Sequence, residues 1–270
     1  MDTDKIILEL ALNLSKDIYR DSLQPSVQTL GQELEQLVSA LKIITLPFAA
    51  MGMSSDYLLA RFGIFLSRSI QKVKQENRTP PHPSISVPIL QNVQLVFDKE
   101  NLCELYSNLL ASASDKTKQS MIHPSFVTII SQLDPLDVLL LEQLRTAAML
   151  PFMEVKSIPK DSASLSYSIV EPFCLIAGHE KDYENIAASL RNLQRLGLLQ
   201  KSTAMVQANK LDTFQEIYNS APFASTRNIL EKMQREQLSL ESTSITAIKG
   251  CFVLTVLGRK FLLSCLEPRP

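Results

Sequence analysis

The sequence predicts a mainly α-helical protein, in which an N-terminal helical arm and a helical bundle precede a domain that adds a small β-hairpin to its helices. Three observations lead to this prediction. Apolar residues recur at steps of three and four along much of the chain, which is the period of a helix with one buried face. The chain contains 7 glycines and no tryptophan, a composition that fits a mainly helical protein. At 270 residues it exceeds the usual size of a single core, so we expect more than one domain.

We expect residues 1–76 to form the helical arm. Its clearest feature is an apolar seam between residues 27 and 44, whose members alternate steps of three and four. Such a narrow seam is suited to packing on a partner helix, either within the chain or in a second copy. The seam residues are Val27, Leu30, Leu34, Leu37, Leu41 and Ile44.

The end of the arm is rich in apolar residues. The chain carries no charge from Ile43 to Ser55, and a second apolar run follows at residues 57–66. These runs predict a buried helical hairpin, and the alternative is a membrane-perturbing segment at residues 37–70. The lipid-contacting side chains in that alternative are Phe48, Phe62 and Phe65. A permanent span is not expected, because charges interrupt both runs short of the roughly 20 apolar residues that a span needs.

A proline-rich linker is predicted at residues 77–88, between the arm and a central helical region at 89–132. Four prolines in nine positions disfavour both a helix and a central strand in the linker. The central region then predicts three helices, of which the last starts near Pro124. The middle helix is expected to bury Leu102, Leu105, Leu109, Leu110 and Ala113.

Polar and small residues of the central region are predicted to serve its architecture. Asn108 lies on an otherwise apolar helix face, where we expect it to satisfy a nearby backbone group. The small residues 111–114 allow another helix to approach closely. His123 precedes Pro124, which disfavours a helical conformation at His123 and predicts a cap-like role.

Residues 133–270 are predicted to form the C-terminal domain. Its first helix starts at Asp134 and Pro135, a pair typical of an N-cap followed by the first helical position. Residues 185–200 begin with a predicted helix that ends at Gly197, and LLQK after it is predicted as a short strand.

The end of the domain has a recognisable order of parts. Residues 251–266 predict a strand, a cap at Thr255 and a final helix. The preceding 204–247 is interpreted as an inserted segment, with a helix at 225–238.

A helix ending in LxxLGL, a pair of strands and the pattern LTxxGxxFL together resemble the winged-helix domains of bacterial regulators. That resemblance implies a DNA-binding regulator as one alternative. Its DNA contacts would be Arg191, Asn192, Gln194, Arg195 and Lys201. However, residues 133–270 carry 15 basic and 15 acidic side chains, and a neutral domain binds phosphates weakly at physiological salt.

The motifs of common enzymes are missing from the sequence. No glycine pattern matches a phosphate-binding loop, and the three histidines form no zinc-binding pattern. A nucleophilic pair of Cys103 and His123 is conceivable, but a buried, inert thiol is the preferred interpretation. We therefore expect no enzyme, with no catalytic residue, cofactor, metal or small-molecule substrate. Four cysteines without CxxC and a start without a basic n-region favour a cytoplasmic protein, with peripheral contact at the inner membrane as an alternative.

Two stretches of the sequence carry a family resemblance. YSNLLASASDKTKQSMIHPSFVTIISQLDPLD at residues 106–137, here called the central signature, resembles the Abi-alpha family of bacterial proteins, which is linked to abortive infection by phage. DIYRDSLQPSVQTLGQELEQLV at 17–38 is similar to the opening helix pair of that family. The resemblance implies an accessory or effector protein of anti-phage defence and transfers no catalytic residues. Together with the seam, it favours action through protein–protein contacts, by a partner or by self-association.

Overall fold

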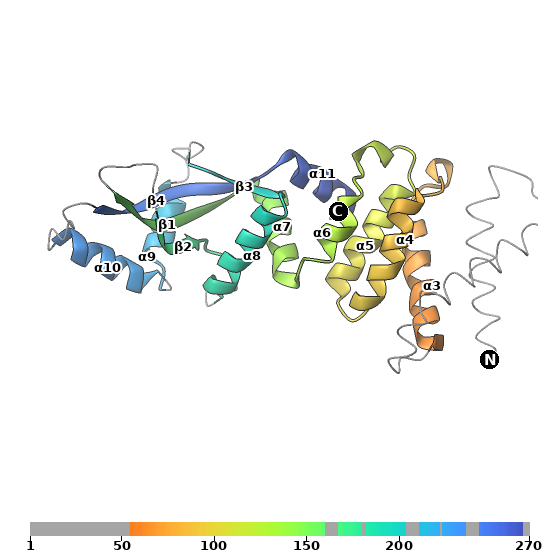
Figure 1. The fold of residues 1–270 in the computed structure, drawn as a ribbon, viewed down its shortest axis with the longest axis horizontal. Coiled ribbons are helices and arrows are strands. Elements are labelled where there is room, and N and C mark those ends of the chain that lie inside the picture. The colour runs from red at the N-terminus through yellow and green to blue at the C-terminus, as the bar shows by residue number, and fades with distance from the viewer. Residues whose placement is uncertain are drawn as a thin grey trace, which may run out of the picture. The chain divides into compact units, whose positions relative to one another are not determined.

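The computed structural model describes residues 55–159, 167–179, 182–203, 211–221, 223–235 and 243–266 (Figure 1). The apolar seam and Phe48 lie outside the described residues. The chain divides into two compact units: unit 1 is Met1–Pro135 with Lys260–Pro270, and unit 2 is Leu136–Arg259. We expected residues 133–270 to form one domain, whereas the structure places the end of the last helix in unit 1.

Nine α-helices and four strands are found in the described part of the chain. The helices are α3 (Ser55–Gln71), α4 (Pro83–Val93), α5 (Glu100–Ala113), α6 (Ser125–Ile130), α7 (Pro135–Ala147), α8 (Tyr183–Arg195), α9 (Leu211–Asn219), α10 (Ala224–Arg235) and α11 (Val256–Cys265). The strands are β1 (Met149–Pro159), β2 (Tyr167–Phe173), β3 (Leu199–Ser202) and β4 (Thr243–Leu254). The prediction of a largely helical protein is confirmed, but the sheet is larger than the predicted hairpin.

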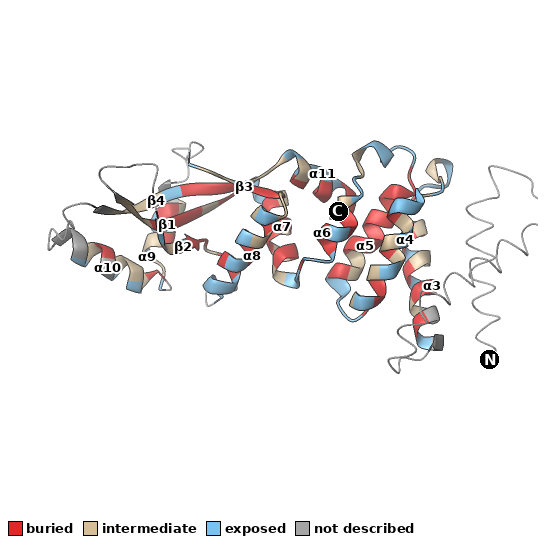
Figure 2. Ribbon diagram, viewed as in Figure 1, coloured by how far each residue is buried: buried red, intermediate tan, exposed pale blue. Residues whose placement is uncertain are grey.

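Unit 1 is a helical bundle built around α5. Most of α5 is buried, as its red colour in Figure 2 shows, and α3, α4 and α6 all contact it. The five apolar residues predicted to be buried on this helix are buried. Phe126 of α6 packs edge-on against Phe261 of α11, with ring centroids 5.4 Å apart.

Helix α4 begins inside the predicted linker, so the linker prediction is wrong for residues 83–88. Pro83 occupies the first helical position, where its missing N–H costs nothing. The His82 ring caps the helix by accepting a hydrogen bond from the Ser84 backbone N–H at 3.2 Å. Pro88 lies inside the helix and cannot donate to the Ser84 carbonyl. Since Ser84 is exposed, water can satisfy that carbonyl instead.

The polar residues of the central signature cap the end of α11. The Asn108 side-chain amide donates to the Cys265 carbonyl at 2.9 Å, and the Ser112 hydroxyl donates to the Ser264 carbonyl at 2.9 Å. The last carbonyls of a helix have no partner within the helix, so these bonds satisfy groups that would otherwise be buried unpaired. The predicted role of Asn108, to satisfy a backbone group, is confirmed.

Helix α6 starts in the same way as α4. The His123 ring accepts a hydrogen bond from the Ser125 backbone N–H at 3.2 Å, which confirms the predicted cap-like role. The two His-Pro-Ser sequences of the chain, at 82–84 and 123–125, thus form matching helix starts. These two histidines are therefore explained by architecture.

Unit 2 contains an antiparallel sheet with strand order β2-β1-β4-β3. Its longest ladder joins β1 to β4, from Met149 opposite Val253 to Pro159 opposite Thr243. The sequence predicted only the short strand pair formed by β3 and the end of β4, so β1 and β2 were missed. Helices α9 and α10 lie between β3 and β4 in sequence, where the insertion was predicted.

The two faces of the sheet carry different side chains. On one face, Met153 and Val155 of β1 pack with Phe173 of β2 and with the buried residues of α9 and α10. Those residues are Phe214 and Ile217 of α9 and Leu230 of α10, joined by Phe223 just before α10. Because successive side chains of a strand alternate between faces, Phe152 and Glu154 belong to the other face.

The start of the last helix, α11, is hydrogen-bonded to the turn that follows α8. Gly197 has a positive φ of 73°, as predicted for the residue that ends the helix. The Thr255 hydroxyl donates to the Gly197 carbonyl at 2.6 Å and accepts from the Gly258 N–H at 2.9 Å, so Thr255 caps α11 as predicted. Gly258 lies so close to this turn that a Cβ there would come within 2.2 Å of the Leu198 carbonyl oxygen.

Candidate functional site

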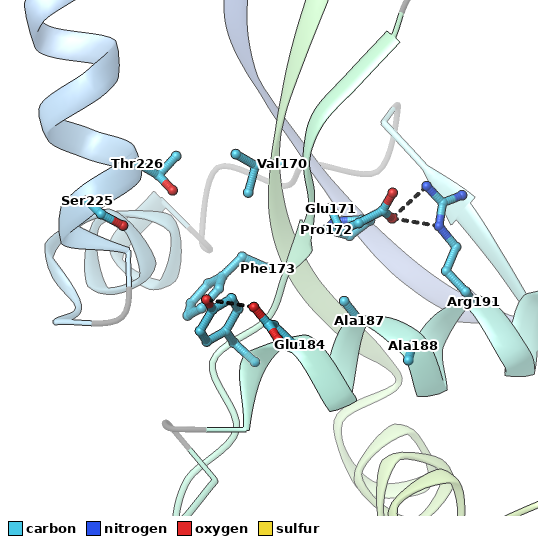
Figure 3. Close-up of a pocket in the computed structure, with 11 residues that line it drawn as sticks. Val170, Glu171, Pro172, Phe173, Glu184, Ala187, Ala188, Arg191, Ser225 and Thr226 are labelled. Atoms are coloured by element: carbon cyan, nitrogen blue, oxygen red, sulfur yellow. Dashed lines mark hydrogen bonds and ion pairs between the residues drawn. The ribbon is translucent and has the colours of Figure 1, made fainter.

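A surface pocket of about 330 Å³ lies between β2, α8 and the start of α10 in unit 2 (Figure 3). We call it the α8 pocket. Its lining residues are Val170, Glu171, Pro172, Phe173, Tyr183, Glu184, Ala187, Ala188, Arg191, Ser225 and Thr226. The volume falls at the lower end of the range for small-ligand sites and suits a few side chains of a partner.

Strand β2 supplies one wall of the α8 pocket and is an edge strand of the sheet. Its pairing with β1 shifts register twice, between the β1 residues Met153 and Val155 and again between Val155 and Lys156. Pro172 also lacks the N–H that a further strand would need. Register irregularities and proline discourage pairing with another strand, so this wall offers side chains rather than a free backbone edge.

The floor of the α8 pocket is apolar and rests on a stack of rings. The buried Phe173 ring lies 6.0 Å from the Tyr183 ring and 5.6 Å from the Phe223 ring, measured between centroids. Ala187, on the second turn of α8, leaves room above this floor. Tyr183 is 41% exposed, so one face of its ring remains available for contact.

Charged groups occupy the rim of the pocket. The Arg191 guanidinium contacts one carboxylate oxygen of Glu171 through two nitrogens, each at 2.7 Å. The Tyr183 hydroxyl donates to Glu184 at 3.1 Å. This hydrogen bond to a negative carboxylate raises the pKa of Tyr183 above its ordinary value, so the phenol stays protonated. Two carboxylates and one guanidinium leave the rim with an excess of negative charge.

The chemistry of the lining favours contact over reaction. Ser225 and Thr226 supply hydroxyls, but no histidine, cysteine or lysine is among the described lining residues. A hydroxyl nucleophile needs an adjacent base, and here both carboxylates of the rim are already engaged with Arg191 and Tyr183. What the arrangement offers is an apolar depression, an exposed tyrosine and a salt bridge at its edge.

The residues predicted to contact DNA do not form a single basic surface. Arg191 is ion-paired with Glu171, while Asn192 donates to the Asp137 carboxylate at 2.9 Å. Arg195 donates to the Asn192 side-chain oxygen at 2.7 Å, and Gln194 is half-buried. Of the predicted set, the α8 pocket includes Arg191.

Lys201 lies in the sheet of unit 2, where it pairs with a buried carboxylate. Its ammonium group lies 2.6 Å from a carboxylate oxygen of Glu154, which is buried, and 5.1 Å from the Phe152 ring centroid. Lys156 contacts the other carboxylate oxygen of Glu154 at 3.1 Å. Since a buried carboxylate needs a compensating charge, Lys201 is occupied in the fold.

The residues predicted to touch a membrane are placed in the core where they are described. Phe62 and Phe65 are 1% and 3% exposed, and the Phe62 ring packs edge-on against Phe97 with centroids 5.2 Å apart. Neither can reach lipid unless unit 1 opens. Among the described residues, no helix combines the length and the hydrophobicity that crossing a membrane requires.

No cluster of three or more potential metal ligands occurs in the described ranges. Cys103 on α5 is half-buried, and burial, followed by the charge of Glu100, raises the pKa of its thiol. A raised pKa opposes formation of the nucleophilic thiolate. The structure thus supports the inert interpretation of Cys103, and the His123 ring is engaged by Ser125.

Sequence reasoning did not find the α8 pocket as a site. Arg191 was noticed because of its charge, but Phe173, Tyr183 and Thr226 come from three segments that only the fold brings together. The tyrosine at the first position of an amphipathic helix was the one local signal available.

Fold and site together define a class: a protein with a helical unit and a unit that combines helices with an antiparallel sheet, in which the second unit carries a partly apolar surface pocket. The family model described as abortive infection alpha matches residues 57–265, more than three-quarters of the chain, and the chain belongs to this family. Membership suggests an anti-phage role in abortive infection. The match includes the central signature and both units, whereas the stretch at 17–38 lies before its start. No curated protein and no solved structure matches the chain.

Proposed function

We propose that this protein is a non-enzymatic effector or accessory of abortive infection that acts through protein–protein contacts at the α8 pocket. Family membership supports the role in defence. The shape and chemistry of the α8 pocket support action through protein–protein contacts. Interfaces concentrate binding energy in tyrosine and arginine side chains that surround apolar depressions. Tyr183 and Arg191 flank such a depression here.

The partner is defined by the chemistry of the rim. Glu171 and Glu184 outnumber Arg191, so a complementary segment presents an apolar side chain next to a basic group. The apolar side chain fills the space over Phe173 and Ala187, and the basic group lies against Glu184. Strand addition is disfavoured by the irregular β2 edge, so we propose that side chains dominate the contact.

The winged-helix interpretation of unit 2 and its DNA-binding function form the competing hypothesis. Arg191 and Lys201 both hold carboxylate partners within unit 2, which leaves little charge for phosphates. A Glu171→Gln variant separates the two hypotheses, because it releases Arg191 and removes one negative charge. DNA affinity should rise in this variant if DNA is the ligand, whereas a partner with a basic group should bind less well.

The experiment that tests the proposal measures phage plating on a sensitive host that carries this chain with its gene neighbours. Ala188→Arg places a long charged side chain in the pocket, and Asn185→Arg places the same charge one turn earlier, outside the lining. We expect the first variant to lose protection and the second to keep it. Absence of protection by the unaltered chain would contradict the defence role, and equal protection by both variants would contradict the pocket.

A further inference from the structure

Tyr183 presents an open aromatic ring at the rim of the α8 pocket. Among the side chains that the structure describes, the exposed tyrosines and phenylalanines are Tyr57, at 49%, and Tyr183, at 41%. The Arg61 guanidinium lies over the Tyr57 ring, 5.7 Å from its centroid. None of the cation–ring contacts in the described part of the chain involves Tyr183. Its ring is therefore open to a cation from a partner.

Two contacts hold the Tyr183 ring in place. It lies against the buried Phe173 ring, at 6.0 Å between centroids. Its hydroxyl donates to Glu184 at 3.1 Å, as the dashed line in Figure 3 shows. Because these contacts already fix the side chain, little further rotamer freedom is lost when another group packs on its exposed side.

The charge beside this ring is negative. Glu184 is exposed, and its partner among the described residues is the neutral Tyr183 hydroxyl. The other rim carboxylate, Glu171, differs because the Arg191 guanidinium already compensates its charge. Glu184 thus places an uncompensated carboxylate at the edge of an exposed ring.

We propose that the basic group of the partner is an arginine, whose guanidinium stacks on Tyr183 and donates to Glu184. This inference rests on the proposed protein contact at the α8 pocket and names the side chain that the contact requires. A guanidinium is planar and weakly hydrated, so it stacks on a ring while its N–H groups reach a carboxylate. A lysine ammonium is compact and strongly hydrated, and its ion pair at an exposed rim contributes little.

The chain uses the same combination of groups within its own fold. The Arg227 guanidinium lies 5.8 Å from the Tyr218 ring centroid and donates to the Tyr218 backbone carbonyl at 2.9 Å. Arginine therefore supplies the cation at both described tyrosines that have one, the other cation being Arg61. Tyr183 and Glu184 provide an equivalent ring and acceptor, and the guanidinium comes from the partner.

Two short peptides test the preference on the full-length chain. Acetyl-Leu-Arg-amide and acetyl-Leu-Lys-amide carry the same apolar side chain and the same charge. The methyl groups of Ala187 and Ala188 line the pocket and report binding by NMR after selective labelling of alanine. We expect the Kd of the arginine peptide to be about fivefold lower. Equal affinity of the two peptides, or no change at these methyl groups with either, would overturn the inference.

Variants of the ring separate stacking from other causes. Tyr183→Phe keeps the ring and should keep the preference for arginine, whereas Tyr183→Leu should bind both peptides equally. The Ala247 methyl group, which packs against the core of unit 2, reports that each variant folds. Persistence of the preference in Tyr183→Leu, or its loss in Tyr183→Phe, would contradict stacking.

Variants of the carboxylate test the charge. Glu184→Gln should weaken the binding of both peptides by a similar factor, because each peptide carries one positive charge. Glu216→Gln removes the same charge from an exposed position of α9 outside the lining and should leave both affinities unchanged. Equal effects of the two variants would show that Glu184 does not contact the peptides.

This result is separable from that of the plating experiment. Loss of protection by Ala188→Arg together with equal binding of the two peptides would leave the protein contact in place and overturn the arginine preference alone. Selective binding of the arginine peptide together with full protection by Ala188→Arg would contradict the role of the pocket in defence and support the preference for a guanidinium.

Discussion

Asn108 and Ser112 explain, at the scale of single residues, why polar side chains interrupt the apolar α5. Each donates a hydrogen bond to a carbonyl in the last turn of α11, more than 150 positions away in sequence. Sequence analysis predicted that Asn108 would satisfy a backbone group, because a buried amide on an apolar face requires a partner. It could not name the partner, since nothing in the central signature points to the end of the chain.

Gly258 is the residue where a single added methyl group should matter most. A Cβ at this position would come within 2.2 Å of the Leu198 carbonyl oxygen, so the turn or α11 must shift. We expect Gly258→Ala to lower the free energy of unfolding by about 3 kcal/mol, the upper end for added core volume. Urea unfolding measures this change, with the exposed Val256→Ala on the same helix as a control of little effect.

Lys201 is predicted to be a structural cation rather than a ligand contact. Lys201→Met leaves the buried Glu154 carboxylate with Lys156 as its remaining basic partner. We expect the free energy of unfolding to fall by about 3 kcal/mol, the lower end for a broken buried ion pair. Thermal or urea unfolding provides the measurement, and the exposed Arg195→Met serves as the control. Unchanged stability of Lys201→Met would show that the ion pair is unimportant and would revive the DNA alternative.

At the scale of elements, the sequence predicted helices far better than strands. The predicted starts of α6, α7 and α11 were correct, because proline, aspartate and threonine act locally at helix starts. Strand β1 was missed because its apolar and polar residues alternate only from Met153 to Lys156, and two prolines, Pro151 and Pro159, lie close to this short pattern. Its position in the sheet depends on β4, about 90 residues later, and no local pattern encodes that pairing.

The link between α5 and α11 gives a prediction for a whole element. Removing both donors, in Asn108→Ala with Ser112→Ala, should weaken the last turn of α11 by about 1–2 kcal/mol and speed its amide exchange by about tenfold. Hydrogen exchange of residues 260–266 measures this effect. The buried hydroxyls of Ser69 and Ser107 bond to each other and leave α11 untouched, so their double alanine variant is the matched control. Equal acceleration in both variants would mean that general loosening of unit 1, rather than the cap, controls α11.

At the scale of the whole molecule, the two units carry different features. Unit 1 carries the central signature, whose residues serve architecture, while unit 2 carries the α8 pocket. The family model matches residues of both units. The region that it describes therefore includes the unit with the α8 pocket. Sequence reasoning predicted a protein contact but placed it in the N-terminal seam, because the pocket depends on segments from 170 to 226 meeting in space.

The central claim is that the α8 pocket contacts a protein during infection. The most direct measurement places a photo-crosslinking amino acid at Tyr183 in the full-length chain and identifies what it captures in infected cells. We predict a discrete protein adduct that disappears with Ala188→Arg and persists with Asn185→Arg. A nucleic-acid adduct, or a protein adduct unaffected by Ala188→Arg, would contradict the account.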